Sequence, residues 1–192
     1  MPVRLNSSGG GSVTLDVPST AGTFTATVPA NNGTLVTTGS TAAVSQAMLA
    51  SGVAGNGPAF SAFPNAQQSL GASTVTKLLF QSEEFDTNSN YNAGNSRFTP
   101  TVAGYYQINA AFTAAQFFSG GTAYLYKNGF EFKAGNSSGF GGNTSNIWGV
   151  SALVYMNGST DFVEIYGLVT VAQLISFSAA LTYFQASLVR AA

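Results

Sequence analysis

The 192-residue chain has a net charge of −1, only 7% charged residues, and neither cysteine nor histidine. Sparse Lys and Arg exclude a phosphate-backbone partner, and the missing side chains exclude disulfides, thiolate or imidazole zinc sites and histidine-based catalysis. We therefore expect no nucleic-acid partner, and no membrane insertion either, because no stretch is apolar for the roughly 18 residues that a membrane helix needs.

Residues 1–57 are small and hydroxyl-rich, with short extended pieces such as SVTLDV and TFTATV separated by Gly, Pro and Asn turns. This texture is typical of short strands. Phe24 is the only aromatic residue here, so the region cannot bury enough surface to fold alone. We expect an extended N-terminal arm that attaches to another surface, with a short helix over residues 42–52. The opening MPVRLNSSGGGSVTL lacks the apolar run of a signal peptide, so we expect no cleaved leader.

Residues 58–192 contain every aromatic residue of the chain except Phe24. Runs such as YYQINAAFTAA, TAYLYKNG and NIWGVSALVYMNG alternate between apolar and polar residues and end in Gly, Asn or Ser, a pattern that predicts antiparallel strands. Asn128-Gly129 and Asn157-Gly158 are the dipeptides that favour tight turns, so we predict a β-hairpin at each. The region therefore reads as one all-β sandwich domain.

One group of residues has fixed intervals within this domain: Phe80, Asp86, Tyr91, Phe98, Gly104, Tyr106 and Ile108. These intervals resemble the signature of the globular head of complement component one-q, a branch of the tumour necrosis factor jelly-roll superfamily. TAYLYKNG and DFVEIYG also look like strands of that family, whose pattern has aromatic residues where this chain has Ile108 and Ala110. The resemblance covers residues 58–192 and implies a ten-stranded antiparallel jelly roll that associates as a compact homotrimer.

The roles of the same residues can also be predicted from physical chemistry, without the family resemblance. Phe98, Tyr106, Ile108 and Phe112 alternate towards one face, where large rings fill a sandwich core. We expect Gly104 to permit the backbone turn into the strand YYQIN, and Asp86 to hold the loop before Tyr91 through backbone hydrogen bonds. The candidate trimer-interface residues are aromatics assigned to the family's inner sheet: Phe112, Tyr155 and Tyr183.

The only acidic cluster is Glu83, Glu84 and Asp86. Paired carboxylates can hydrolyse glycosides or bind calcium, but the run lacks the ligand spacing of a calcium loop, and we favour solvated loop charges. We predict no cofactor, no metal site and no enzymatic activity.

Four other features of the head can be interpreted from the sequence. Asp161 and Glu164 are interpreted as outward-facing strand residues, and Arg97 as a partner for an acidic side chain that the sequence does not identify. Trp148 is favoured as a core residue over a sugar-stacking one. The loop Gly135 to Asn146 is either a flexible connection or an apical recognition surface.

The segment before the head resembles the Thr/Ala/Pro-rich pieces of tailed-bacteriophage fibres. We therefore predict a homotrimeric phage virion surface protein, made in the bacterial cytoplasm, whose residues 1–57 dock on other virion proteins. Its head would project outward, with a host-surface glycan or receptor as a further partner. Head and tail locations both remain open. The alternative is a stand-alone secreted one-q-like binding module or lectin.

Overall fold

A computed structural model describes residues 3–6, 8–10, 12–15, 57–114, 120–138 and 146–192. All regular structure in these ranges is β-strand, which confirms the predicted all-β class. The described part of the chain has no helix long and apolar enough to cross a membrane. The helix predicted over residues 42–52 lies outside the described residues.

The described N-terminal residues form a small antiparallel hairpin of β1 (Val3–Asn6) and β2 (Ser12–Leu15). Its register pairs aliphatic positions with one another, Val3 with Leu15 and Leu5 with Val13. An isolated two-stranded hairpin is at best marginally stable in water. This unit therefore needs further contacts to persist, as the composition of the arm predicts.

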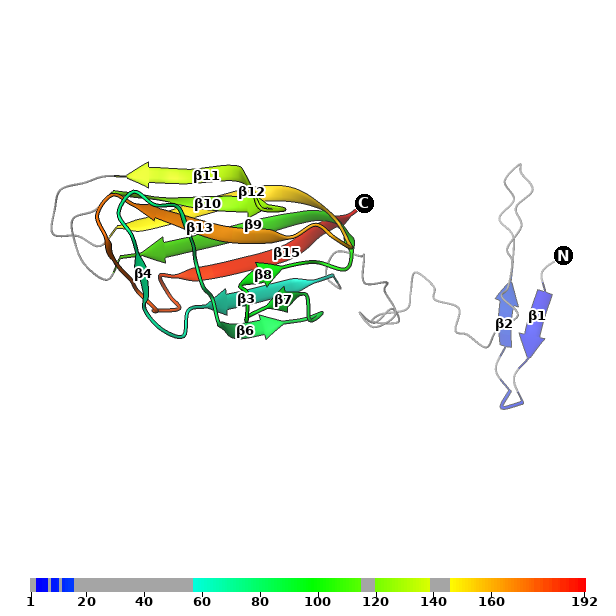
Figure 1. Cartoon of the computed structure of the whole chain (residues 1–192). Helices are drawn as coiled ribbons and strands as arrows, with labels where there is room; N and C mark the ends of the chain where they lie inside the picture. The colour runs from blue at the N-terminus through cyan, green and yellow to red at the C-terminus, as the bar shows by residue number, and fades with distance from the viewer. Residues whose placement is uncertain (1–2, 7, 11, 16–56, 115–119, 139–145) are drawn as a thin grey trace. The chain divides into compact units, whose positions relative to one another are not determined.

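The head is a sandwich of two antiparallel sheets (Figure 1). One sheet has six strands: β11 (Phe130–Ser138), β10 (Gly121–Lys127), β13 (Val163–Val169), β8 (Arg97–Phe98) and β7 (Tyr91–Asn92) in that order, with β5 (Thr76–Lys77) paired to β13. The other has five, in the order β12 (Ile147–Asn157), β9 (Ala103–Thr113), β15 (Tyr183–Ala191), β3 (Ala59–Phe63) and β6 (Ser82–Asp86). A separate pair joins β4 (Gln68–Leu70) to β14 (Gln173–Ile175). The sequence resemblance implies ten strands. The described head contains the strands β3 to β15, more than ten, because short pieces such as β5, β7 and β8 are assigned as separate strands.

The core lies between the two sheets and is dominated by aromatic rings. Strand β9 shows the underlying period of two: Tyr106, Ile108 and Phe112 are fully buried, whereas Tyr105 on the other face is 43% exposed. Phe60 from β3 stacks on Tyr91 and Phe98 at centroid distances of 4.4 and 4.7 Å. It also meets Phe184 edge-on at 4.9 Å. Rings from β3, β7, β8 and β15 therefore form one continuous cluster.

Gly104 has a different role from the predicted one. It lies inside β9 and not in a turn before the strand, so the prediction was wrong. A Cβ atom on Gly104 would lie 2.4 Å from the carbonyl oxygen of Arg190 and 2.8 Å from the side chain of Leu188. Glycine is needed there because β15 has an irregular register between Leu188 and Arg190 and its backbone approaches β9 closely.

The two Asn-Gly dipeptides have different outcomes. Asn128 and Gly129 have φ of 54° and 82° and join β10 to β11, so the first predicted hairpin is confirmed. Asn157 and Gly158 do not join paired strands, because β12 belongs to the five-stranded sheet and β13 to the six-stranded one. The Asn157 side chain instead accepts hydrogen bonds from the backbone N–H groups of Ser159, Thr160 and Asp161. This loop carries the chain from one sheet to the other, and the second hairpin prediction was wrong.

The described head begins and ends at one end of the sandwich (Figure 1). The Leu188 N–H donates to the Pro58 carbonyl, and the Ala192 N–H donates to the Ala103 carbonyl. The start of β3 is thus fixed beside the end of β15.

Candidate functional site

The outer face of the five-stranded sheet carries large apolar side chains that nothing in the described chain covers. Tyr105, Leu153, Tyr155 and Val189 come from the neighbouring strands β9, β12 and β15, and each is between 43% and 55% exposed. Tyr105 and Tyr155 are cross-strand partners whose ring centroids lie 5.5 Å apart. We call these four residues the apolar corner.

Next to the apolar corner, the same face carries neutral polar side chains, and its charged neighbours are Arg190, which pairs with Tyr105, and the Glu84 carboxylate, which is bonded to Ser61. The Gln107 Nε2 donates to Ser151 Oγ, and Ser151 Oγ donates to Asn109 Oδ1, over 2.9 and 2.8 Å. On the adjoining strands, the Gln185 Nε2 donates to Ser61 Oγ at 3.1 Å. These five residues, the polar band, satisfy much of their hydrogen-bonding capacity among themselves. Covering them would therefore leave few hydrogen-bond donors or acceptors without a partner.

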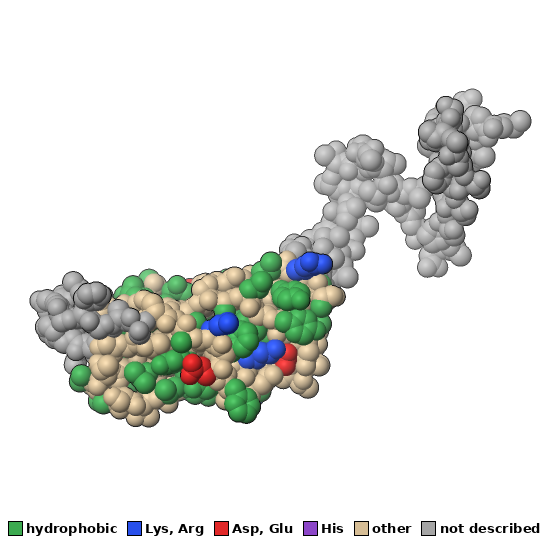
Figure 2. Space-filling view, turned by 90° about the horizontal axis from the view of Figure 1, so that it is seen from above, with side chains coloured by type: hydrophobic (Ala, Val, Ile, Leu, Met, Phe, Trp, Pro, Cys, Tyr) green, Lys and Arg blue, Asp and Glu red, His purple; other side chains and the backbone are tan. Residues whose placement is uncertain are grey.

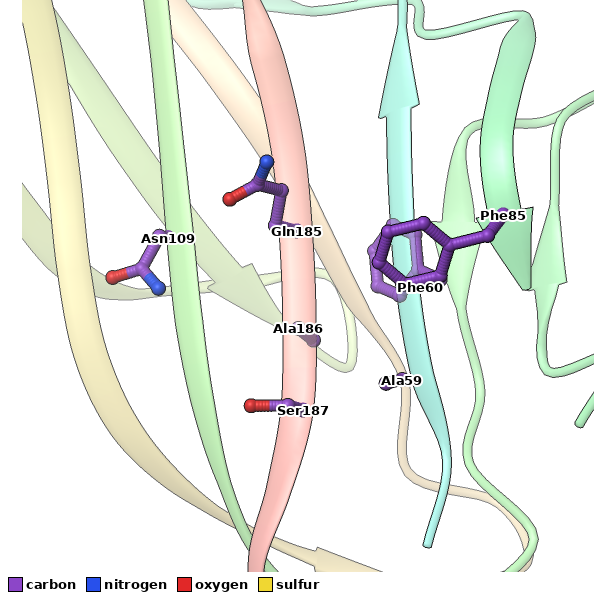
Figure 3. Close-up of a pocket in the computed structure, with 7 residues that line it drawn as sticks. All are labelled: Ala59, Phe60, Phe85, Asn109, Gln185, Ala186 and Ser187. Atoms are coloured by element: carbon purple, nitrogen blue, oxygen red, sulfur yellow. The ribbon is translucent and has the colours of Figure 1, made fainter. Parts of the chain in front are cut away.

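A shallow groove of about 210 Å³ lies on this face between β6 and β9. Its lining residues are Ala59, Phe60, Phe85, Asn109, Gln185, Ala186 and Ser187. In Figure 3 the ring of Phe85 reaches from β6 across β3, while the amides of Asn109 and Gln185 lie over β9 and β15. No lining side chain is ionisable, so the groove offers an apolar wall and neutral hydrogen-bonding groups rather than acid–base chemistry.

The six-stranded sheet carries a charged cluster on its own outer face. The buried Glu164 carboxylate accepts hydrogen bonds from Lys77 Nζ at 2.6 Å, Arg97 Nε at 2.8 Å and the Tyr166 hydroxyl at 3.3 Å. The Arg97 guanidinium also stacks on Phe162, 3.7 Å from the ring centroid. We call these five residues the Glu164 cluster.

Electrostatics in this cluster keep Glu164 ionised. Burial alone would raise the pKa of its carboxyl, but the hydrogen bonds and charges of Lys77 and Arg97 hold that pKa below its usual value. Burial and the neighbouring Glu164 raise the pKa of the Tyr166 hydroxyl, which therefore stays a donor at neutral pH.

Replacing Glu164 by glutamine should change how stability depends on pH. A carboxyl with a depressed folded-state pKa stabilises the fold above its unfolded pKa, about 4.3, and the contribution is lost as pH falls through the folded value. The wild-type melting temperature should therefore drop between about pH 5 and pH 2 more than that of Glu164→Gln. At pH 7 the variant should be less stable by about 1–2 kcal/mol, because it loses the charged partner of Lys77 and Arg97. The loss is no larger because both cations are partly solvated. Thermal melts of both proteins across this range, at one protein concentration, test the expectation. Parallel curves would contradict it.

The structure places most of the residues with motif spacing in the interior. Phe80, Phe98, Tyr106 and Ile108 are fully buried, and Tyr91 is 6% exposed. The Tyr91 hydroxyl donates to the Phe80 carbonyl at 2.6 Å. Burial raises the pKa of Tyr106 to about 12, so that hydroxyl also remains protonated. These rings contribute to the core and not to an exposed site.

Asp86 holds the loop before Tyr91 as the sequence predicted. Its Oδ2 accepts a hydrogen bond from the Tyr91 N–H at 2.8 Å, and its Oδ1 accepts one from the Asn88 N–H. Two further polar residues of this loop were missed by the sequence reasoning. Buried Asn90 accepts from the Thr101 N–H, and buried Ser96 accepts from the Phe80 N–H.

The three candidate interface residues occupy different environments. Phe112 is fully buried with its ring centroid 5.1 Å from that of Trp148, so its assignment to an interface was wrong. It has the same strand parity as Tyr106 and Ile108, which face the core. Tyr155 is 44% exposed in the apolar corner, and Tyr183 is partly exposed on the same face of the sheet. These two remain candidates for contacts with another chain.

Glu83, Glu84 and Asp86 lie in the edge strand β6 and not in the loop that the sequence predicted. The register of β6 against β3 shifts at this point, and Glu84 lies in the irregularity between Glu83, which pairs with Ala62, and Phe85, which pairs with Ser61. The Glu84 carboxylate accepts a hydrogen bond from Ser61 Oγ at 2.6 Å. Among the described residues, no group of three acidic side chains could hold a metal ion.

The remaining residues singled out in the sequence also have defined places. Trp148 is fully buried, as its favoured reading predicted. The acidic partner of Arg97 is Glu164, and Asp161 forms an ion pair with Lys127 at 2.9 Å. Glu164 lies on the outward face but is buried under its partners rather than solvated. Of the segment Gly135 to Asn146, interpreted as either a flexible connection or a recognition surface, residues 135–138 belong to β11 and residues 139–145 lie outside the described residues, so neither interpretation is tested.

Comparison with known proteins identifies the fold. No protein-family model matches the chain, and no curated protein matches its sequence. Among solved structures, the globular domain of zebrafish complement 1qA is similar, with a TM-score of 0.55 and 16% identity over 70% of this chain and 99% of that one. Murine APRIL is similar with a TM-score of 0.51 and 13% identity over 67% of this chain and 96% of that one. At such identities the likeness shows the fold alone, and the head of this chain has the jelly-roll fold of the complement one-q and tumour necrosis factor-like proteins.

Proposed function

We propose that the chain is a homotrimeric bacteriophage surface protein of the fibre or decoration kind. Residues 1–57 attach it to the particle, and the jelly-roll head projects outward, where it contacts a glycan or receptor of the host surface. The observation that carries the trimer is the uncovered outer face of the five-stranded sheet, with its apolar corner beside an uncharged polar band.

This sheet face suits burial against further copies of the chain. Burying the four side chains of the apolar corner is favourable, at about 25 cal/mol per Å² of apolar area removed from water. The five side chains of the polar band are neutral and hydrogen-bonded to one another, and the Glu84 carboxylate that contacts them accepts a hydrogen bond from Ser61 at 2.6 Å. Figure 2, which views the head from above rather than onto this sheet, shows scattered basic and acidic side chains, and with a net charge of only −1 the long-range repulsion between copies is weak.

Trimerisation also fits the weakness of the arm. The hairpin of β1 and β2 has two open edges within the described residues and is too small to be stable alone. A trimer brings three arms together, where they can cover each other or one surface of the particle. Three linked heads would also multiply weak contacts with a host surface through their effective concentration.

The virion assignment rests on the chain's composition. The Thr/Ala/Pro-rich arm resembles the segments of phage fibres, and the absence of cysteine fits assembly in a reducing cytoplasm. A stand-alone secreted binding module or lectin is the alternative, and the similarity of the head to an isolated globular domain favours it.

Light scattering and particle analysis test the two parts of the proposal separately. At micromolar concentration the full chain should have a mass of about three times 19.7 kDa, and a mass near 19.7 kDa would contradict the trimer. Mass spectrometry and antibody labelling of purified phage particles should find the chain on the virion. Its presence only in particle-free culture medium would instead support the secreted module.

A further inference from the structure

The outer face of the six-stranded sheet combines stacked aromatic rings with a fixed cation. Tyr126 and Tyr166 lie in β10 and β13, and their rings stack with a centroid distance of 4.1 Å. The guanidinium of Arg97 is fixed nearby between Glu164 and Phe162. This face is opposite the sheet face that we propose for self-association, so a trimer would leave it uncovered.

The strand register brings these groups into one row. Val163 pairs with Phe98, so their neighbours Glu164 and Arg97 lie side by side, and Tyr126 pairs with Glu164 on the other side. Adjacent strands are about 4.8 Å apart, so Arg97 and Tyr126 flank Glu164 at roughly 10 Å from each other along the backbone. That span matches a single sugar ring with a substituent.

The row retains unused hydrogen-bond donors at its cationic end. Lys77 and Arg97 carry two positive charges against the one negative charge of Glu164, and exposed Glu131 beyond Tyr126 makes the whole row neutral, with Arg97 near one end and Glu131 at the other. Arg97 uses Nε for Glu164, and its two terminal amino groups have no acceptor among the described residues. Its side chain is 37% exposed. A held guanidinium with a free edge is a good donor pair for a carboxylate.

We propose that this surface binds an acidic sugar, a pyranose with a carboxylate such as a hexuronic-acid residue of a surface polysaccharide. The carboxylate pairs with the free edge of Arg97, and the apolar face of the sugar ring packs on the face of the Tyr126 ring that Tyr166 does not cover. The proposal names the ligand of the host contact and in that sense rests on the proposed function, but the site is complete within one head.

The surrounding charges fix the orientation of the sugar. Glu131 in β11 pairs with Tyr126 on the side away from Glu164 and is exposed. Its carboxylate would repel the acid group of the sugar and accept hydrogen bonds from sugar hydroxyls. The acid group is therefore directed to Arg97, and the hydroxyls to Glu131.

Titration of the full chain with a short oligogalacturonate, followed by calorimetry, tests the proposal. The matched ligand is the same oligosaccharide with its carboxylates converted to methyl esters. The acid form should bind measurably at millimolar concentration and more weakly as salt is added, and the ester should bind at least about 10-fold more weakly. Equal binding of the two forms, or no binding of either, would overturn the proposal.

Matched variants locate the site. Arg97→Gln and Tyr126→Ala should each weaken binding by about 10-fold or more, while Lys133→Gln, which removes a cation from the neighbouring edge strand, should leave it unchanged. Arg97→Lys keeps the positive charge but loses the paired N–H donors of the guanidinium, and should bind the acid form with intermediate strength. An equal loss of binding in Lys133→Gln would mean that binding depends on the overall positive charge of the surface and not on Arg97, and would overturn the proposed site. Light scattering on the same samples separates these outcomes from failure of the trimer, because no variant lies on the proposed interface.

Discussion

Replacing Phe60 by alanine should lower the free energy of unfolding by about 3–5 kcal/mol, the range for a buried phenylalanine whose removal leaves a cavity. Phe60 is 1% exposed and contacts the rings of Tyr91, Phe98 and Phe184. These partners come from strands β7, β8 and β15, so the cavity would lie where the two sheets meet. Urea denaturation at one protein concentration, with oligomeric state checked in parallel, measures the effect.

Phe130 provides the control for this substitution. It is the first residue of β11 and is 78% exposed beside the Asn128-Gly129 turn. Phe130→Ala should change stability by less than about 0.5 kcal/mol, as surface substitutions usually do. Similar losses in both variants would mean that the ring cluster around Phe60 does not stabilise the sandwich.

The sandwich and much of its core could be predicted because they depend on local pattern. Alternation within one strand is enough to place Tyr106, Ile108 and Phe112 on the same side, and a face that carries several large apolar side chains is the one expected to form the core. Asp86 acts within five residues along the chain, through the Tyr91 N–H, so its role was also visible in the sequence. Such short-range constraints do not require knowledge of which strands pair.

The errors arose where the outcome depended on strand order. An Asn-Gly dipeptide favours a tight turn, but it does not say whether the next strand pairs with the last one. Asn157-Gly158 therefore precedes a change of sheet rather than a hairpin. Gly104 was assigned to a turn because the sequence does not show its close approach to Arg190, which lies near the other end of the domain. Phe112 was assigned to an interface although strand parity already placed it with the core.

Both candidate surfaces were invisible for the same reason. The Glu164 cluster joins Lys77, Arg97 and Glu164, which are up to 87 residues apart in sequence, through the pairing of β5, β8 and β13. The apolar corner likewise combines β9, β12 and β15. Arg97 and Glu164 were each named from the sequence separately, without their pairing, and Tyr155 was named without its neighbours in the apolar corner. Composition restricts which chemistry is available, whereas topology decides which side chains meet.

Replacing Tyr155 by arginine should dissociate the proposed trimer without unfolding the head. Tyr155 is 44% exposed and packs against Tyr105 in the apolar corner, so the substitution is tolerated in a monomer, where the guanidinium reaches water. In a trimer it would place an unpaired charge in an apolar contact, which costs several kcal/mol per copy. The mass should therefore fall from about three times 19.7 kDa to about 19.7 kDa, with an unchanged β-type circular dichroism spectrum. Tyr124→Arg is the matched control: it changes a partly exposed tyrosine on the outer face of the other sheet and should leave the trimer intact. A trimer that persists in Tyr155→Arg, or dissociates equally in Tyr124→Arg, would show that the copies associate through a different surface.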